Sequence, residues 1–286
     1  MKFISCKYFA LALLYLFASS MQADRYSQDY GVECRTRCND YVCGCNPLYC
    51  GALDFQVQGG VLPILWYDRG QFSLIQCQGV AAANPVIPLF QIPKFSKFFK
   101  LPWTVGFQIG YALSDNIRVY YEFDYSQAKS KSSTSLVTSG TSPNTYVFTL
   151  SKYKLYDMYV GGRYYFDRWC EKLSLFLGFK AGFVHHNHVK FSVTSTPPTP
   201  AVTFVSDLNM FKRNTVPSGG LDIGLDLCYC GNWSFVLASG ILASCGPKSN
   251  FNTVLNSTVT LSNNFLIGNI GAELRFPVTL AVRYSF

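Results

Sequence analysis

Apolar and polar residues alternate along most of this chain, and the longest uninterrupted run lies at its C-terminus. From Ile270 to Phe286 every even-numbered position is apolar, whereas the odd-numbered positions are mostly polar, small or charged. A period of two is that of a β-strand with two unlike faces. Pro277 has no amide hydrogen, so we expect a bulge or a gap in the hydrogen-bond ladder there. The pattern predicts one long strand.

The same alternation begins again near residues 53, 103, 117, 158, 173, 221 and 233. The connections between these segments alternate in length, with short turns at 114–116, 167–172 and 231–232 and long polar loops at about 67–101, 129–151, 189–215 and 245–263. Short turns at one end and long loops at the other are typical of a transmembrane β-barrel. Each segment has roughly the 9–11 residues that cross a bilayer at a tilt. We therefore predict an all-β fold, an eight-stranded antiparallel transmembrane β-barrel over residues 52–286, with short periplasmic turns and four long extracellular loops.

A soluble, secreted β-sandwich is the alternative fold, and it would explain the alternation equally well. It does not explain the large aromatic residues that share one face near the predicted strand ends. These residues are Trp103, Tyr125, Phe166, Tyr229, Trp233 and Phe286. Aromatic side chains collect at membrane interfaces. Aromatic residues make up 16% of the chain and charged residues only 14%, against about 25% charged in ordinary globular proteins. Composition therefore favours the barrel.

The N-terminus reads as a secretory signal peptide over residues 1–23. Lys2 and Lys7 precede a short apolar core, and small residues follow it, so cleavage is expected after Ala23 or Ser20. A retained membrane anchor is the alternative. Without Lys2 and Lys7 the net charge falls from +8 to +6. An exported chain of this charge does not favour nucleic-acid binding, and disulfides persist in the compartment it enters.

Two stretches resemble bacterial outer-membrane barrels. The ending Val282-Arg283-Tyr284-Ser285-Phe286 is similar to the terminal strand of that superfamily, and 160–166 (VGGRYYF) resembles small barrels of the OmpA-transmembrane, OmpW and opacity type. The resemblance covers about residues 52–286. It implies integral insertion in the outer-membrane lipid of a bacterial cell. It also implies that Tyr284 and Phe286 form an assembly signal for the barrel-assembly machinery. It implies no particular activity.

The exported chain has ten cysteines, and residues 24–51 form a predicted cysteine-rich periplasmic segment. This segment resembles chlamydial-type cysteine-rich outer-membrane proteins, which implies disulfide cross-links to other envelope proteins as one possibility. The predicted topology places eight cysteines on the short-turn side: Cys34, Cys38, Cys43, Cys45, Cys50, Cys170, Cys228 and Cys230. Cys77 and Cys245 fall on the long-loop side.

Both groups of cysteines are even in number, so every thiol can pair within the chain. The spacing in the N-terminal segment lacks the paired CxxC knuckles of a zinc site. Cys228 and Cys230 are two residues apart on one strand, at the upper limit for bridging each other. We expect each of them to bond the N-terminal segment, and Cys77 to pair with Cys245. Intermolecular cross-linking is the alternative.

The opposite, inward-facing positions of the predicted strands carry twelve charges. They are Asp54, Arg118, Glu122, Asp124, Asp157, Arg163, Lys180, Asp222, Asp226, Glu273, Arg275 and Arg283. The interior of an eight-stranded barrel is narrow enough for side chains to fill it, and buried charges must be paired or hydrated. The interpretation we favour is an ion-pair network that holds the barrel shut. A narrow polar conduit and a pair of catalytic carboxylates are the alternatives.

Other candidate chemistry is sparse. All three histidines lie in His185-His186-Asn187-His188, where two could hold a metal ion, although a solvated loop is the simpler interpretation. Residues 93–100 (PKFSKFFK) could lie at the membrane surface with phenylalanine in the lipid, or form a plain solvated loop. The chain has none of the common hydrolase, metalloprotease or nucleotide-binding motifs. We expect no cofactor, no metal and no enzymatic activity.

We predict a structural and surface-display role in the cell envelope, with disulfides stabilising the protein. A small channel or porin for solutes or apolar compounds is the first alternative, because a barrel interior can conduct. An outer-membrane enzyme is the second.

Overall fold

The computed structural model describes residues 50–68, 95–131, 133–139, 142–166, 173–196, 202–230, 232–248 and 270–286. The predicted signal peptide lies outside the described residues, and so does nearly all of the predicted cysteine-rich segment.

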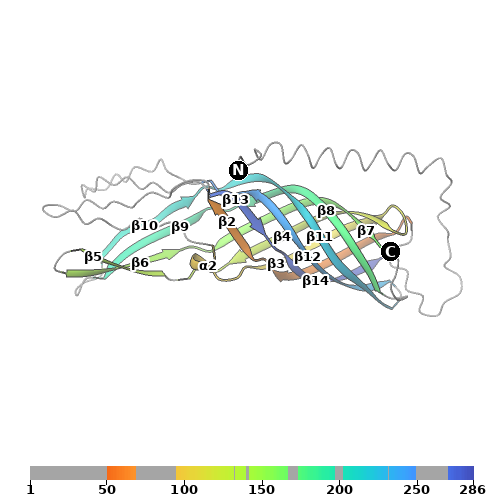
Figure 1. Ribbon diagram of the computed structural model, residues 1–286, viewed down its shortest axis with the longest axis horizontal. Coiled ribbons are helices and arrows are strands. Elements are labelled where there is room, and N and C mark those ends of the chain that lie inside the picture. Colours follow the sequence, from red (N-terminus) through yellow and green to blue (C-terminus); the bar gives the residue numbers. More distant parts are fainter. Residues whose placement is uncertain are drawn as a thin grey trace.

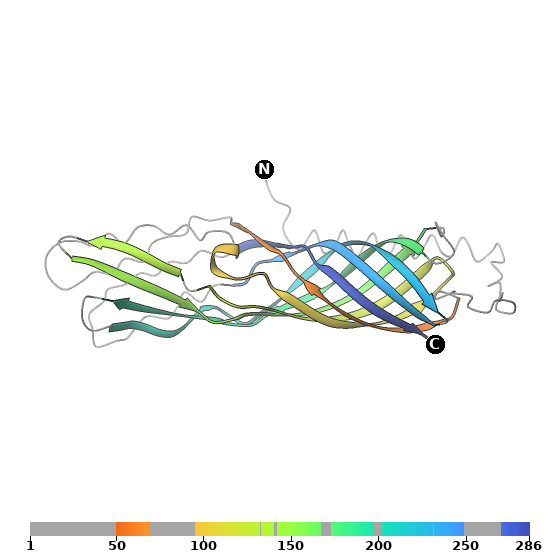
Figure 2. The same ribbon diagram turned by 90° about the horizontal axis from the view of Figure 1, so that it is seen from below.

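Eight antiparallel strands form a closed barrel (Figures 1 and 2). They are β1 (Leu53–Val61), β3 (Trp103–Ala112), β4 (Ile117–Ala128), β7 (Tyr153–Tyr165), β8 (Leu173–His186), β11 (Asn214–Cys230), β12 (Trp233–Cys245) and β14 (Val278–Ser285). Each strand pairs with its neighbours in this order, and β1 pairs with β14 to close the circle. The predicted all-β, eight-stranded antiparallel barrel is confirmed.

The two faces of the barrel strands have opposite chemistry. On β11, Leu221, Ile223 and Leu225 are exposed on the outside, whereas Asp222 and Asp226 are buried inside. The other barrel strands repeat this inversion, so leucine, valine and aromatic side chains make up the exterior. An apolar exterior around a polar interior is the pattern of transmembrane barrels. Among the described residues, none of the helices is long and apolar enough to cross a bilayer.

Two prolines interrupt the barrel wall at the same height. Pro277 lies in the break between β13 (Ile270–Arg275) and β14, and Pro63 lies between β1 and β2 (Ile64–Asp68). Pairing continues on both sides, because β1 pairs with β14 up to Val61 and β2 pairs with β13 from Ile64 onwards. The amide of Phe276 donates to the Pro63 carbonyl at 2.9 Å across the break. The predicted ladder gap at Pro277 is confirmed.

A second, four-stranded sheet projects from the end of the barrel that carries the long connections, away from the C-terminus (Figure 1). It consists of β5 (Ser133–Ser139), β6 (Ser142–Leu150), β9 (Val189–Thr196) and β10 (Val202–Phe211). The prediction of plain loops at 129–151 and 189–215 was therefore wrong. These segments combine serine with many β-branched and aromatic residues, which favour strands, and β6 pairs with β9 to join the two hairpins.

A short helix, α2 (Phe95–Phe98), lies at the mouth of the barrel beside β2. Phe95 and Phe99 are buried there against Trp66 and Tyr153, with ring centroids 4.9–6.1 Å apart. The interpretation that placed the phenylalanines of 93–100 in lipid was wrong for these two residues. Aromatic rings and lysines at this spacing suit a membrane surface and a barrel mouth alike, and in the fold the rings turn inward.

Candidate functional site

The interior of the barrel is the candidate site, because all twelve predicted lumen charges are buried in it. Their relative exposure is at most 9%. They come from β1, β4, β7, β8, β11, β13 and β14, so the network spans the lumen in every direction. Six ion pairs connect eleven of them, all except Asp124, in the part of the chain that the structure describes.

The layer nearest the short turns is built on two arginines. The Arg118 guanidinium donates to both carboxylate oxygens of Asp54, through Nη2 and through Nε, the latter at 2.7 Å. On the other side of the lumen, Arg283 pairs with Asp226 at 2.5 Å and donates to the Tyr165 hydroxyl at 2.9 Å. Each arginine is fully buried, so its ion pair and hydrogen bonds replace the water that it has lost.

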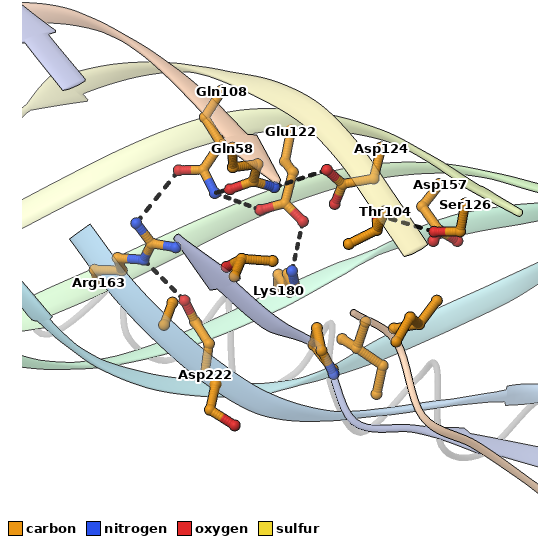
Figure 3. Close-up of a pocket in the computed structure, with 16 residues that line it drawn as sticks. Gln58, Thr104, Gln108, Glu122, Asp124, Ser126, Asp157, Arg163, Lys180 and Asp222 are labelled. Carbon is orange, nitrogen blue, oxygen red and sulfur yellow. Dashed lines mark hydrogen bonds and ion pairs between the residues drawn. The ribbon is translucent and has the colours of Figure 1, made fainter. Parts of the chain in front are cut away.

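The middle layer contains the densest set of contacts (Figure 3). Lys180 pairs with Glu122 at 2.5 Å, and the amide of Gln108 donates to the same carboxylate at 2.6 Å. Arg163 donates to Asp222 at 2.8 Å. The amide of Gln58 donates to Asp124 at 2.7 Å. Arg163 also donates to the amide oxygen of Gln108 at 3.3 Å, so side-chain contacts across the lumen connect β1, β3, β4, β7, β8 and β11 in addition to their backbone pairing.

Arginine stacking adds to the middle layer. The guanidinium carbon of Arg163 lies 4.7 Å from the ring centroid of Tyr120 and 4.4 Å from that of Phe176. Both distances are within cation–π range, and such contacts strengthen when water is excluded. The charge of Arg163 is thus compensated by one carboxylate and two rings.

The layer nearest the long connections centres on Arg275. Its Nη1 donates to both oxygens of Asp157 at 2.6 and 2.8 Å, and its Nη2 donates to the hydroxyls of Tyr159 at 2.7 Å and Ser218 at 2.8 Å. Its Nε lies 3.5 Å from Glu273. One arginine therefore binds side chains from β7, β11 and β13 across the lumen.

Above Arg275, a chain of hydrogen bonds leads into the aromatic mouth. The Tyr153 hydroxyl donates to Glu273 at 2.7 Å and lies 2.9 Å from Nδ1 of His186. The indole of Trp66 donates to the same carboxylate at 2.9 Å. Phe211 packs edge-on against Trp66. We call Trp66, Phe95, Phe99, Tyr153 and Phe211 the mouth cluster, and it covers the polar interior at this end.

A small cavity lies in the lumen. Its volume is about 20 Å³, which is room for roughly one water molecule. Polar side chains line it, including Glu122, Asp124 and Lys180 (Figure 3), and the small residues Ala238 and Thr279 also belong to its lining. Most of the buried charge is compensated within the protein, because eleven of the twelve charged residues form ion pairs.

The histidines are distributed differently from what the sequence suggested. His186 is fully buried beneath the mouth cluster and bound to Tyr153, so the solvated-loop interpretation was wrong for this residue. His185 faces the opposite side of β8, where its Nδ1 lies 2.8 Å from the Thr215 hydroxyl. Among the side chains that the structure describes, no three His, Cys, Asp or Glu residues gather as a metal site.

Most cysteine positions lie outside the described residues: Cys34, Cys38, Cys43, Cys45, Cys77 and Cys170. Cys50 precedes β1 beside the β3–β4 turn, where its amide donates to Asp115 at 3.3 Å. Cys228 is buried near the short-turn end of β11, and Cys230 ends the same strand. Cys245 ends β12 at the mouth. The disulfide pairing stays a prediction.

The predicted assembly signal forms the exposed end of β14. The amide of Phe286 donates to the Leu53 carbonyl at 2.7 Å, and its ring centroid lies 5.0 Å from that of Tyr284. The Phe286 side chain is 62% exposed. It is therefore accessible on the barrel exterior and contributes little to the packed interior.

Deleting Phe286 should slow membrane insertion and leave periplasmic aggregates, because the last strand would lose its terminal contact and its exposed aromatic signal. The measurement is the ratio of surface-inserted to aggregated protein in cells after a short expression pulse. The matched control is Phe166→Ala, which removes another exposed aromatic side chain at the same end of the barrel. Normal surface levels of the truncated chain would contradict an assembly role for Phe286.

Sequence reasoning missed the mouth cluster. Its members come from β2, the α2 segment, β7 and β10, which are far apart in the chain. The one signal in the sequence was the phenylalanine spacing of 93–100. This spacing suits a membrane surface and a barrel mouth equally. Tyr153 and Trp66 carried no sign of their role, since a single aromatic at the end of a strand is common in barrels.

No family model matches this chain, and no curated protein matches it. Among solved structures it is similar to Neisserial surface protein A, at 13% identity and a TM-score of 0.40, covering 82% of this chain and 99% of that one. It is similar to Ail, the attachment invasion locus protein of Yersinia pestis, at 10% identity and a TM-score of 0.35, covering 83% and 100%. For the E. coli outer membrane protein W the identity is 13% and the TM-score 0.25, covering 83% and 98%. Identities this low concern the fold alone, so the role of the protein rests on its own residues.

Proposed function

We propose that this protein is an integral β-barrel of the bacterial outer membrane with a closed lumen, and that its role is structural support and surface display in the cell envelope. The observation that carries the proposal is the interior, where eleven of the twelve buried charged residues form ion pairs with one another beneath an aromatic cover.

Two rows of aromatic rings on the exterior support the membrane placement. At the long-connection end, Trp103, Tyr125, Tyr156 and His185 form a continuous row with centroids 5.2–6.2 Å apart. At the short-turn end, Tyr164 packs against Phe166, and Trp233, Tyr284 and Phe286 form another row. Rows at both ends of an apolar band are the girdles of a transmembrane barrel.

The separation of the girdles fits a bilayer. Tyr156 and Phe166 are ten residues apart along β7 and the residue after it, which is about 33 Å along a strand. At a strand tilt of about 40° this corresponds to a height of about 25 Å, the usual height of the apolar band. Residues between them that face outward, such as Met158, Val160 and Tyr164, are exposed and apolar or aromatic.

Three layers of charge and one aromatic cover make conduction unfavourable. A solute would have to displace the Arg118, Arg163 and Arg275 ion pairs in turn, and each displaced arginine would leave a buried carboxylate without its partner. The four-stranded sheet beyond the mouth carries the two β-hairpins away from the barrel (Figure 2). This arrangement suits display of the hairpins on the cell surface.

The proposal predicts that the purified protein gives no stable conductance in planar lipid bilayers. A variant that removes two mouth rings and the three arginine ion pairs, Phe95→Ala/Phe99→Ala/Asp54→Ala/Arg118→Ala/Asp157→Ala/Arg163→Ala/Asp222→Ala/Arg275→Ala, should give single-channel steps. It removes both partners of each of these three pairs, so none of them leaves a single charge behind. The measurement is single-channel current at several voltages, after a heat-modifiability gel has verified folding.

The control for this experiment is Leu53→Ala/Phe55→Ala/Val57→Ala/Leu225→Ala, which removes four exposed side chains from the exterior. It should stay silent like the unmodified protein. Stable steps from the unmodified protein would contradict a closed lumen and favour a channel.

A channel for small solutes is the second candidate, and the mid-lumen cavity favours it. The cavity lies between charged residues of β4 and β8 and small residues of β12 and β14. A modest shift of the Lys180 side chain would enlarge it. The size of the cavity in this structure, about 20 Å³, is the reason that we place the channel second.

Disulfides and partners complete the proposal. Cys245 at the mouth is a candidate partner for Cys77, and Cys228 and Cys230 are candidates for bonds to the N-terminal cysteines. Outer-membrane lipid and the barrel-assembly machinery are the proposed partners of the barrel, and other envelope proteins are proposed partners of the cysteine-rich segment. Export through a cleaved signal peptide would deliver the chain to this location.

A further inference from the structure

Basic side chains gather around the long-connection end of the barrel. We call eight of them the basic rim: Lys100, Lys129, Lys152, Lys154, Lys190, Lys212, Arg213 and Lys248. All are exposed or half-buried. Lys131 lies at the same end, but its ammonium group donates to the Ser96 carbonyl at 2.7 Å.

Backbone contacts show that the rim residues are close together in two groups. The amide of Lys100 donates to the Lys129 carbonyl at 2.8 Å. Gln127 pairs with Lys154 in the register of β4 and β7, and continuing that register places Lys129 opposite Lys152. On the β11–β12 side, the amide of Lys212 donates to the Lys248 carbonyl at 2.8 Å.

The rim has no acidic counterpart among the described side chains. All six ion pairs in that part of the chain lie inside the barrel. Two acidic residues, Asp68 at the end of β2 and Asp207 in β10, lie toward the long-connection end, but their side chains are outside the described ones. Among the described side chains, the side-chain carboxylate outside the lumen is that of Asp115, in the β3–β4 turn at the opposite end. Like charges opposite each other on neighbouring strands destabilise a sheet. The fold therefore tolerates a repulsion here that a bound anion would relieve.

The position of the basic rim along the barrel axis, relative to the aromatic row, identifies the kind of anion. On β7, Lys154 shares the outward face with Tyr156 and lies two residues beyond it, because Tyr153 and Leu155 are buried. On the β11 side, Arg213 lies two residues beyond Thr215, which pairs with His185 in the aromatic row. The cations thus begin where the girdle ends. That is the level of lipid headgroups, where long basic side chains reach phosphate.

The short-turn end of the barrel has no comparable excess of basic over acidic residues. The turns at 114–116, 167–172 and 231–232 contain Asp115, Asp167, Arg168, Glu171 and Lys172, which nearly cancel. Overall basicity of the chain therefore does not account for the rim. The asymmetry indicates that the two leaflets present different headgroups to this protein.

From the placement, the missing acids and the asymmetry, we propose that the basic rim binds the phosphate groups of phosphorylated lipid headgroups in the leaflet on the long-connection side. The lipid is favoured over a soluble polyanion because the lysines directly adjoin the girdle. This inference depends on the membrane placement proposed above and goes beyond the structural role.

The test uses the full exported chain refolded in a zwitterionic detergent. Diphosphorylated lipid A is the lipid probe, and its dephosphorylated form, inorganic phosphate and a heparin oligosaccharide are the comparisons. Bound ligands are counted by native mass spectrometry at increasing salt. The rim variant is Lys152→Gln/Lys154→Gln. An anionic surface attracts each nearby lysine enough to change affinity about fivefold, so affinity for the phosphorylated lipid should fall about 25-fold.

Two control variants keep the result specific. Arg168→Gln/Lys172→Gln removes the same charge in the connection between β7 and β8 and should leave binding unchanged. Lys152→Arg/Lys154→Arg keeps the charge and should retain binding. Heat modifiability on a gel verifies that every variant has a folded barrel, which separates a loss of lipid binding from a failure of the membrane fold.

Three outcomes would overturn the proposal. The first is equal affinity for the phosphorylated and dephosphorylated lipid. The second is equal loss of binding in the rim variant and in the β7–β8 variant. The third is tighter binding of the heparin oligosaccharide or of inorganic phosphate, with no effect of lipid, which would assign the rim to a soluble anion.

Discussion

Arg275→Met should destabilise the barrel by about 3–5 kcal/mol, the usual cost of leaving a buried ion-pair partner uncompensated. Arg275 is fully buried and donates two hydrogen bonds to Asp157, one to Tyr159 and one to Ser218. Methionine fills similar volume but leaves the Asp157 carboxylate in a dry interior. The measurement is the free energy of unfolding in lipid vesicles, obtained from a guanidinium titration.

Two further variants distinguish the effect of the lost charge on stability from the effect of changed packing. Arg213→Met removes an exposed arginine of the basic rim and should change stability by less than about 0.5 kcal/mol. Arg275→Met/Asp157→Leu removes both partners and should recover much of the loss, because replacing a whole buried pair with apolar groups is often neutral. If Arg275→Met proved as stable as Arg213→Met, the Arg275 layer would not hold the barrel together.

Leu221→Arg should destabilise the inserted barrel by about 2–4 kcal/mol, the cost of a charged side chain on the lipid face near the middle of the bilayer. Leu221 faces outward on β11, with Phe179 and Ile241 as its partners on the neighbouring strands. No lumen or rim group is available to the new guanidinium. The measurement is the fraction of heat-modifiable, folded protein after refolding into vesicles.

The matched control is Thr215→Arg, a substitution to the same residue on the same strand and the same face, six residues nearer the mouth. Thr215 is exposed beside the basic rim, where a new arginine reaches water and should cost at most about 1 kcal/mol. Equal effects of the two substitutions would argue that the exterior of β11 does not face lipid.

The sequence by itself determined which segments form the barrel strands and which way their residues face. A side-chain period of two is a local property of an extended backbone, so Leu221 to Leu227 on β11 could be assigned to one face without knowledge of any partner strand. The number of strands and their antiparallel order followed from the turns. The ladder gap at Pro277 followed from the missing amide hydrogen alone.

Only the tertiary structure decided which groups meet. Asp54 and Arg118 are 64 residues apart, and Asp157 and Arg275 are 118 apart. Their pairing depends on the stagger of strands around the closed barrel, which no local pattern encodes. The same holds for the four-stranded sheet, because β6 and β9 gain their stability by pairing with each other. The rings of Phe95 and Phe99 could have been buried either in lipid or in the barrel mouth, because both environments are apolar. The contacts with Trp66 and Tyr153 selected the mouth, and these form only when β2 and β7 are brought together by closure of the barrel.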